Sequence, residues 1–373
     1  MIHPPGLKRK AILGGGELLI RPTAEIMTRG SGCLQKRAKK SSGKKRRVQD
    51  NNIKVEVLLK VQCKKTQKLG SDGDRPCCPD ALVCPSCLSC TGWDAVEDVL
   101  VNAARGTQRL GHSLTFMQKH PKIQPQMRSI LLDWLIEVSE AYTLHRQTFY
   151  LAQDYFDRFM LTQKNLDKSV LQLIGVTCLF IASKMEEANP PKLSEMACVT
   201  AGAFYEDEIL KMELIILQAL NWSLRSETAL SWLRLFLQIA SMNVTSELLE
   251  SQFPPEVYVQ MTRLLDLCGL SIDSLDFSPH VLAASVCCHF LNQERVLRIS
   301  GLSEDLIQPC INWMVPFADS IGHFGRAPLK DFARICGDDS HNIQTHADYM
   351  TMLDEVSKKQ ATIQLLPEQT CTG

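Results

Sequence analysis

The sequence predicts an all-α protein in which two successive groups of five helices follow a polar N-terminal region. Apolar residues recur at helical spacing from Trp93 onward, and strand-like alternation of apolar and polar residues is scarce. The helical stretches also fall into two sets of about a hundred residues each. Two such sets fit a pair of similar helical domains better than one large bundle.

The elements are expected in a regular order along the chain. Trp93, Val96, Val99 and Leu100 predict a short N-terminal helix. The first group is predicted at residues 126–142, 147–161, 169–185, 192–199 and 206–220. The second group is predicted at residues 227–241, 254–271, 279–291, 304–321 and 329–335. The expected regions are a disordered basic, Cys-rich segment at 1–92, a helix and linker at 93–120, domains at 121–225 and 226–340, and an extension at 341–373.

Prolines mark where several of these elements begin or end. Pro121 and Pro125 disfavour helix just before them, so the first group is expected to start at about residue 126. Pro190 and Pro191 separate the third and fourth helices. The apolar run at 170–182 is shorter than the roughly 18 to 20 residues of a membrane span, and we expect a buried core helix there.

Charge is distributed unevenly, although the net charge of the chain is zero. Residues 1–75 hold 19 Lys and Arg against 6 Asp and Glu, whereas the remainder is acidic. The basic residues cluster within 36–47, at Lys36, Arg37, Lys39, Lys40, Lys44, Lys45, Arg46 and Arg47. This run resembles a nuclear localisation signal and predicts a nuclear protein. Nucleic-acid binding and a solvated tail are the alternatives, but the run has no aromatic residue to stack on bases.

The chain has 15 cysteines. Because Glu17 and three glycines interrupt the apolar stretch near the N-terminus, a secretory signal is not expected, and the thiols should be reduced. Cys84 and Cys87 have the spacing of one zinc knuckle, but no second knuckle lies at the usual distance. A Cys-rich linker is therefore favoured over a metal site, and no cofactor is expected.

Four apolar residues, Met127, Ile130, Leu131 and Trp134, share one stripe of the helix predicted at 126–142. Such a stripe usually faces a protein core, and less often it forms a groove for a partner. Spacing alone leaves both interpretations open.

Five residues connect the chain to a known family. Arg128 lies in Met-Arg-Ser-Ile-Leu, Asp157 in Tyr-Phe-Asp-Arg-Phe, Leu173 in Leu-Gln-Leu, Lys184 in Ala-Ser-Lys-Met-Glu-Glu, and Glu213 in Leu-Lys-Met-Glu. In identity, order and spacing they resemble the cyclin box. Residues 144–146, 149–153, 313–317 and 341–346 look most like cyclin E. The resemblance covers residues 93 to about 356 and implies two tandem five-helix cyclin folds.

The resemblance implies a regulatory subunit that activates a cyclin-dependent kinase, most closely cyclin-dependent kinase 2, at the G1/S transition. It assigns Lys184 and Glu213 to hydrogen bonds with kinase backbone groups. Without it, both would be ordinary solvated charges. The resemblance places four apolar kinase contacts around them: Met185, Leu217, Trp222 and Leu224.

The resemblance also implies a groove that recruits substrates and inhibitors carrying Arg-x-Leu motifs. The residues assigned to this groove are Met127, Ile130, Leu131, Trp134, Glu137, Leu171 and Gln172. Arg128 and Asp157 are implied to form a structural ion pair between the first two helices, and Leu173 is also structural. Losing one partner of a buried pair costs roughly 3 to 5 kcal/mol.

Other function classes find less support. The chain has no P-loop, kinase catalytic triplets or nucleophile elbow, so no enzyme is expected. Glu186 and Glu187 fit a helix end better than an acid–base pair, and His341 and His346 do not share a helix face for a metal. A transcription-initiation factor with tandem cyclin folds should carry basic domains, but residues beyond 75 are acidic. A non-activating helical scaffold is the second alternative.

Overall fold

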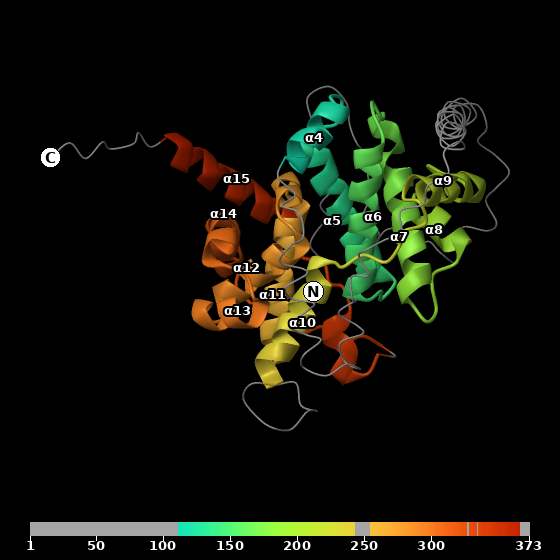
Figure 1. Cartoon of the computed structure of the whole chain (residues 1–373). Helices are drawn as coiled ribbons and strands as arrows, with labels where there is room; N and C mark the ends of the chain where they lie inside the picture. Colours follow the sequence, from blue (N-terminus) through green and yellow to red (C-terminus); the bar gives the residue numbers. More distant parts are fainter. Residues whose placement is uncertain (1–110, 243–253, 327, 334, 366–373) are drawn as a thin grey trace, which may run out of the picture.

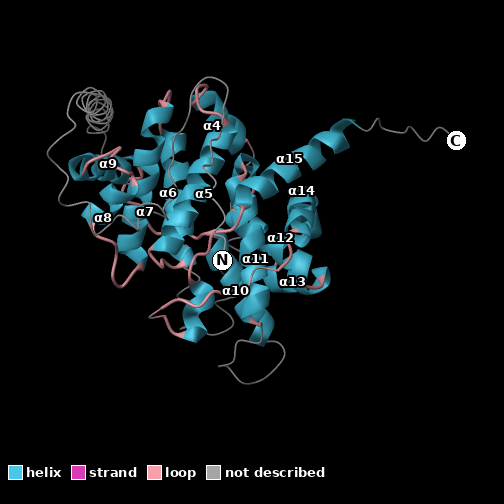
Figure 2. Ribbon diagram, turned by 180° about the vertical axis from the view of Figure 1, so that it is seen from behind, coloured by secondary structure: helices cyan, strands magenta, loops and turns pink. Residues whose placement is uncertain are grey.

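The structure is a computed structural model that describes residues 111–242, 254–326, 328–333 and 335–365. This part of the chain is helical, with one isolated β-bridge between His145 and Ile343 (Figures 1 and 2). The all-α prediction is therefore confirmed. The helix predicted near Trp93, the basic run at 36–47, and Cys84 and Cys87 lie outside the described residues.

The first group of helices packs around α7 (Leu171–Glu186). It also contains α5 (Pro125–Ala141), α6 (Arg146–Thr162), α8 (Leu193–Val199) and α9 (Glu206–Ala219), each within two residues of its predicted bounds. α7 is nearly all apolar, and the segment Lys168–Glu186, which includes the 3-10 turn η3 (Lys168–Val170), is long and apolar enough to span a membrane. Its apolar window is 72% buried inside the fold, so it is a core helix.

A glycine sets how closely α5 and α7 pack. A Cβ atom built on Gly175 would lie 2.9 Å from Cδ1 of Leu131, which is fully buried. Because Gly175 has no side chain, α5 and α7 can approach closely, and Leu131 packs directly on the α7 backbone at this point.

The second group packs around α12 (Pro279–Phe290) and also has five helices, but one of them differs from the prediction. α10 (Ala229–Met242), α11 (Pro255–Leu270) and α14 (Glu304–His323) were predicted. The fifth is α13 (Gln293–Ser300), which was missed because it is short and mostly polar. The Asn292 side chain caps it, accepting from the backbone N–H of Glu294 and Arg295.

The helix predicted at residues 329–335 is wrong. The described residues of this segment form no helix, and Leu329 and Lys330 are exposed. Lys330 Nζ donates to Glu140 Oε1 on α5 at 2.6 Å, so a contact with another element replaces helical packing. A segment of seven residues is too short to form a stable helix by itself, because helix nucleation is costly.

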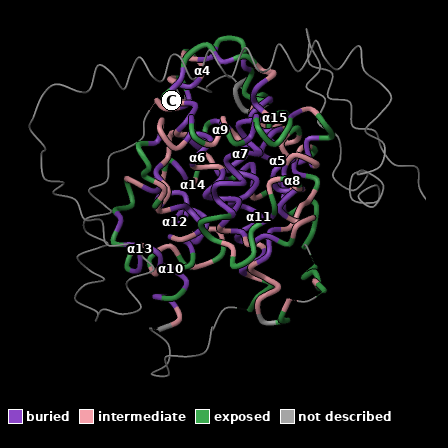
Figure 3. The backbone as a smooth tube through the Cα atoms, turned by 90° about the vertical axis from the view of Figure 1, so that its right-hand side faces the viewer, coloured by how far each residue is buried: buried purple, intermediate pink, exposed green. Residues whose placement is uncertain are grey.

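In the part of the chain that the structure describes, two helices lie outside the two groups. α4 (His112–Lys119) contacts α6 and the 3-10 turn η4 (Ile272–Asp276), so it touches both groups. α15 (Tyr349–Leu365), which was not predicted, packs against α14, α5 and α11 after the turn η5 (Gly337–Asn342). Figure 3 shows the buried residues, in purple, gathered in the interior of the molecule.

A buried arginine joins the two groups. Arg128, which has no exposed surface, donates from Nε and Nη2 to the two carboxylate oxygens of Asp157, both at 2.7 Å. Its Nη1 donates to the carbonyl oxygens of Gly269, Leu270 and Ser271, at and just beyond the end of α11. Cationic groups are favourable at a helix C-terminus, so one side chain ties α5, α6 and α11 together.

Asp266 is a second junction. Its buried carboxylate accepts from the hydroxyls of Tyr150 at 2.6 Å and Tyr349 at 3.0 Å, and from Gln344 Nε2 at 2.9 Å. Burial raises the pKa of Asp266, while Arg146 and these hydrogen bonds oppose the shift. The donors come from α6, α15 and the segment between η5 and α15, so Asp266 holds the C-terminal extension onto both groups.

Candidate functional site

The two charges assigned to kinase binding lie together at the end of α7 and the middle of α9. Lys184 Nζ forms an ion pair with the Glu213 carboxylate, and these side chains are 39% and 13% exposed. The ammonium group also lies 4.2 Å from the centroid of the Phe180 ring. A donor and an acceptor are thus held side by side on an accessible surface.

Four exposed apolar side chains belong to the same region. Met185, Leu210, Leu214 and Trp222 are 51%, 48%, 44% and 62% exposed. We call these residues, with Lys184 and Glu213, the α7–α9 surface. Several large apolar side chains exposed together typically mark a binding site for a partner.

Leu210 and Leu214 were missed in the sequence, although a signal was present. Leu210, Glu213, Leu214 and Leu217 recur at i, i+3, i+4 and i+7 and therefore share one face of α9. Leu217 is half-buried, at the base of this face. The spacing of this stripe indicates a binding surface only when the structure shows that no other helix among the described residues covers this face of α9.

The backbone presents Trp222 outward. α9 ends in two hydrogen bonds, from Asn221 N–H to Gln218 O at 3.1 Å and from Trp222 N–H to Leu217 O at 2.9 Å. This pattern is a Schellman motif. Both Asn221 and Trp222 are left-handed, with φ of 51° and 59°. Such a conformation disfavours a bulky residue, and strained residues of this kind cluster at functional sites.

The segment after Trp222 is anchored to α6. The Tyr155 hydroxyl donates to Leu224 O at 2.7 Å, and Arg158 donates to Ser223 O and Ser226 Oγ, both at 2.8 Å. Leu224 is half-buried as a result. The sequence-predicted contacts Leu217 and Leu224 therefore form the base of the α7–α9 surface, and Met185 and Trp222 form its exposed part.

Comparisons with known proteins decide the family. The model of the cyclin N-terminal domain matches residues 99–225, and that of the cyclin C-terminal domain matches residues 228–351. The chain belongs to the cyclin family. It is 49% identical to G1/S-specific cyclin-E1 of Gallus gallus over 286 residues, which are 77% of this chain and 70% of the relative. It is 50% identical to G1/S-specific cyclin-E1 of Danio rerio over 268 residues, which are 72% of this chain and 65% of the relative.

Among solved structures, a viral cyclin from herpesvirus saimiri is 20% identical and superposes with a TM-score of 0.45, over 53% of this chain and 86% of that one. Family membership makes the chain a non-catalytic regulatory subunit of a cyclin-dependent kinase acting at G1/S. A transcription-initiation factor is disfavoured, because the relatives at about half identity are cyclins E.

Most of the apolar residues assigned to substrate docking in this cyclin have little exposed surface. Met127, Leu131, Trp134 and Leu171 are 4%, 0%, 3% and 0% exposed. Ile130, Glu137 and Gln172 are half-exposed. Three of the four stripe residues pack into the first group of helices, and Ile130 lies at the edge. Such low exposure fits a core face and also the floor of a shallow groove, so the docking assignment stays a prediction.

The structural residues of this cyclin occupy buried positions. Arg128 and Asp157 form the pair described above, and Leu173 is fully buried in α7. The pair does more than join the first two helices, because Arg128 also bonds the end of α11. This third connection was not evident in the sequence.

The helix-end interpretation of Glu186 and Glu187 is confirmed. α7 ends at Glu186, and the Glu187 carboxylate accepts from the backbone N–H of His145 at 2.8 Å and from the Thr148 hydroxyl at 2.5 Å. It thereby caps the first turn of α6. His346 bonds Asp133 and the His341 ring packs on Tyr258, and the described residues contain no cluster of three metal-ligating side chains.

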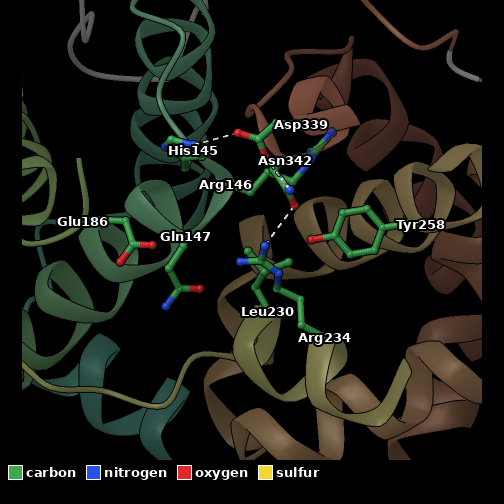
Figure 4. Close-up of a pocket in the computed structure, with 9 residues that line it drawn as sticks. All are labelled: His145, Arg146, Gln147, Glu186, Leu230, Arg234, Tyr258, Asp339 and Asn342. Atoms are coloured by element: carbon green, nitrogen blue, oxygen red, sulfur yellow. Dashed lines mark hydrogen bonds and ion pairs between the residues drawn. The ribbon is translucent and has the colours of Figure 1, made fainter. Parts of the chain in front are cut away.

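A cavity of about 220 Å³ lies beside this helix start, between α6, α10, α11 and η5 (Figure 4). Two arginines, Arg146 and Arg234, and two carboxylates, Glu186 and Asp339, are among the residues that line it. Arg234 Nη2 donates to Asn342 Oδ1 at 3.1 Å. The charges lining this cavity are therefore balanced.

His145 should make the stability of this cyclin depend on pH. Burial lowers the pKa of His145, but the hydrogen bond to Glu187 and the charges of Glu187 and Asp339 outweigh it and raise the pKa overall. When the pKa of a histidine is higher in the folded than in the unfolded protein, its protonation stabilises the fold. This stabilisation is fully present at a pH below the unfolded-state pKa of about 6.5, and it is lost as the pH rises through the folded-state pKa. H145Q should therefore unfold at a lower temperature than wild type at about pH 5.5, with a smaller difference at about pH 8.5. Thermal melts of both proteins test this, and a difference independent of pH would contradict it.

Proposed function

We propose that this cyclin activates cyclin-dependent kinase 2 by binding it through the α7–α9 surface. The observation that supports this is the combination of an accessible Lys184–Glu213 pair with four exposed apolar side chains. A protein kinase is active only when the Glu of its αC helix pairs with the strand Lys that holds the ATP phosphates. A partner that binds αC only in this position shifts the kinase toward its active state.

Each part of the surface has a role in this proposal. Trp222, Met185, Leu210 and Leu214 bury apolar area against the kinase, which supplies much of the affinity. Lys184 and Glu213 turn from one another to kinase backbone groups, so that the lysine donates and the glutamate accepts. In the unbound chain the ion pair keeps both groups at the surface that would meet the kinase.

Mixing the full chain with purified cyclin-dependent kinase 2 and following phosphorylation of a short Ser-Pro peptide tests the proposal. We expect at least about a hundredfold stimulation, which corresponds to a barrier lowered by about 2.7 kcal/mol. A complex that forms without stimulation would support the scaffold alternative instead.

We also propose that the edge of the α5 stripe recruits substrates with Arg-x-Leu motifs. Glu137 would bind the arginine, and the half-exposed Ile130 and Gln172 lie beside it in this assignment. Trp134 is 3% exposed, so the leucine would contact only the edge of this side chain. The basic run at 36–47 would direct the complex to the nucleus.

E137K should impair docking without damaging the core. An exposed ion pair contributes up to about 1 kcal/mol, so phosphorylation of an Arg-x-Leu substrate should fall by up to about fivefold while that of a short peptide is unaffected. Glu294 is exposed on α13, away from α5, which makes E294K the matched control. An equal loss on both substrates would show that Glu137 acts on folding or kinase binding.

A further inference from the structure

A second cavity, of about 240 Å³, lies between α11, the end of α14 and the segments on either side of η5. Four basic residues line it, Arg263, Arg326, Lys330 and His346. No Asp or Glu is among the lining residues, in contrast to the balanced cavity of Figure 4. Its charge is therefore suited to an anion.

Two of the basic groups already have acidic partners outside the cavity. Lys330 Nζ lies 2.6 Å from Glu140 Oε1, and His346 Nε2 lies 2.9 Å from Asp133 Oδ1. Arg263 and Arg326 form no ion pair with any residue that the structure describes. These two guanidinium groups carry the uncompensated charge of the cavity.

Arg263 is the more unusual of the two because it is buried, with 7% of its surface exposed. Its Nη1 donates to Gly325 O at 2.6 Å, but its Nε is buried and has no hydrogen-bond partner among the described residues. The nearest carboxylate along α11, Asp266, is already engaged by Tyr150, Tyr349 and Gln344. A buried guanidinium with an unused donor is costly unless an anion binds it.

We propose that this cavity binds the phosphoryl group of a phosphorylated serine or threonine within a peptide. Guanidinium groups bind phosphoryl oxygens in a bidentate manner, and Arg263 and Arg326 would each supply donors. Val259 and Phe324 line the same cavity and would contact an apolar side chain next to the phosphorylated residue. The choice of a phosphopeptide rests on the proposed function, because a Ser/Thr kinase bound to this cyclin produces such groups nearby.

Binding of this kind would retain a substrate after its first phosphorylation. The cavity is lined by α11, the end of α14, the start of α15 and the segments beside η5, whereas the α7–α9 surface is on the first group of helices. Figure 1 shows α7 and α9 apart from α11, α14 and α15. A phosphorylated residue held in the cavity would raise the local concentration of further sites on the same substrate.

The full chain, without kinase, should be titrated into a fluorescein-labelled Leu-phosphoserine-Pro peptide and its unphosphorylated form, and binding followed by fluorescence anisotropy. We expect at least tenfold tighter binding of the phosphorylated peptide, and competition by inorganic phosphate. R326Q, at an exposed position, should lose most of this preference, whereas R298Q, at an exposed position on α13, should keep it. R263Q should behave like R326Q if its thermal midpoint shows that it folds.

Equal binding of the two peptides, or equal effects of R326Q and R298Q, would overturn the proposal. Binding of a single-stranded RNA of similar charge as tightly as the phosphopeptide would also overturn it, since the site would then be a general polyanion surface. The assay contains no kinase, so failure of kinase stimulation and failure of phosphopeptide binding are separate results.

Discussion

The double variant K184E/E213K is expected to fold like the wild type and to bind the kinase at least about 30-fold more weakly. The exchanged side chains still form an ion pair with one another, so the packing of α7 on α9 is preserved. Position 184 then offers the kinase a hydrogen-bond acceptor in place of a donor, and position 213 offers a donor in place of an acceptor. Disrupting buried charged hydrogen bonds at an interface costs roughly 2 to 5 kcal/mol, or about 30-fold to several thousandfold in affinity.

Isothermal titration calorimetry with purified kinase measures this loss, and circular dichroism checks the fold. E294R/R298E, an exchange between exposed residues on α13, is the matched control and should bind like wild type. If K184E/E213K kept wild-type affinity, the kinase would have to bind elsewhere on the cyclin.

The second large effect is expected from D157A, which should lower the free energy of unfolding by about 3 to 5 kcal/mol. Arg128 would remain buried with two donors that no longer have a carboxylate. Because Arg128 also bonds three carbonyl groups at the end of α11, the change should weaken the contact between the two groups of helices.

Urea denaturation at pH 7 measures this effect. K211A breaks the exposed pair between Lys211 and Asp207 and should cost less than about 1 kcal/mol. The variant R128M/D157L removes both charges and should be more stable than D157A, because it leaves no unpaired charge. A cost for D157A no larger than that for K211A would show that the buried pair does not hold the fold.

Much of the fold was predictable because its pattern is local. The apolar spacing of α5, α6, α7 and α9 is strong, and those helices match their predicted bounds within two residues. α13 is polar and short, and its N-cap residue Asn292 is a weak indication of a helix. The apolar residues at 329–335 gave a stronger helix prediction, but the described residues of this segment form no helix. The local sequence pattern does not show whether a segment forms a helix or instead makes a contact with a distant residue. The contact between Lys330 and Glu140 joins residues that are 190 positions apart.

The site was predictable in part for the same reason. Lys184 and Glu213 were identified through the family motif, and the structure brings them together across 29 residues. The stripe at Met127 has the same spacing as the stripe at Leu210, yet the first is mostly buried and the second exposed. Spacing specifies which side chains share a face, but only the packed fold determines which face is covered.

The most direct test of the central proposal is amide hydrogen exchange of the full chain with and without cyclin-dependent kinase 2. Binding through the α7–α9 surface predicts that kinase-induced protection concentrates at the end of α7, along α9 and around Trp222. Protection confined to α5 or to the second group of helices, with α9 unchanged, would contradict the proposal.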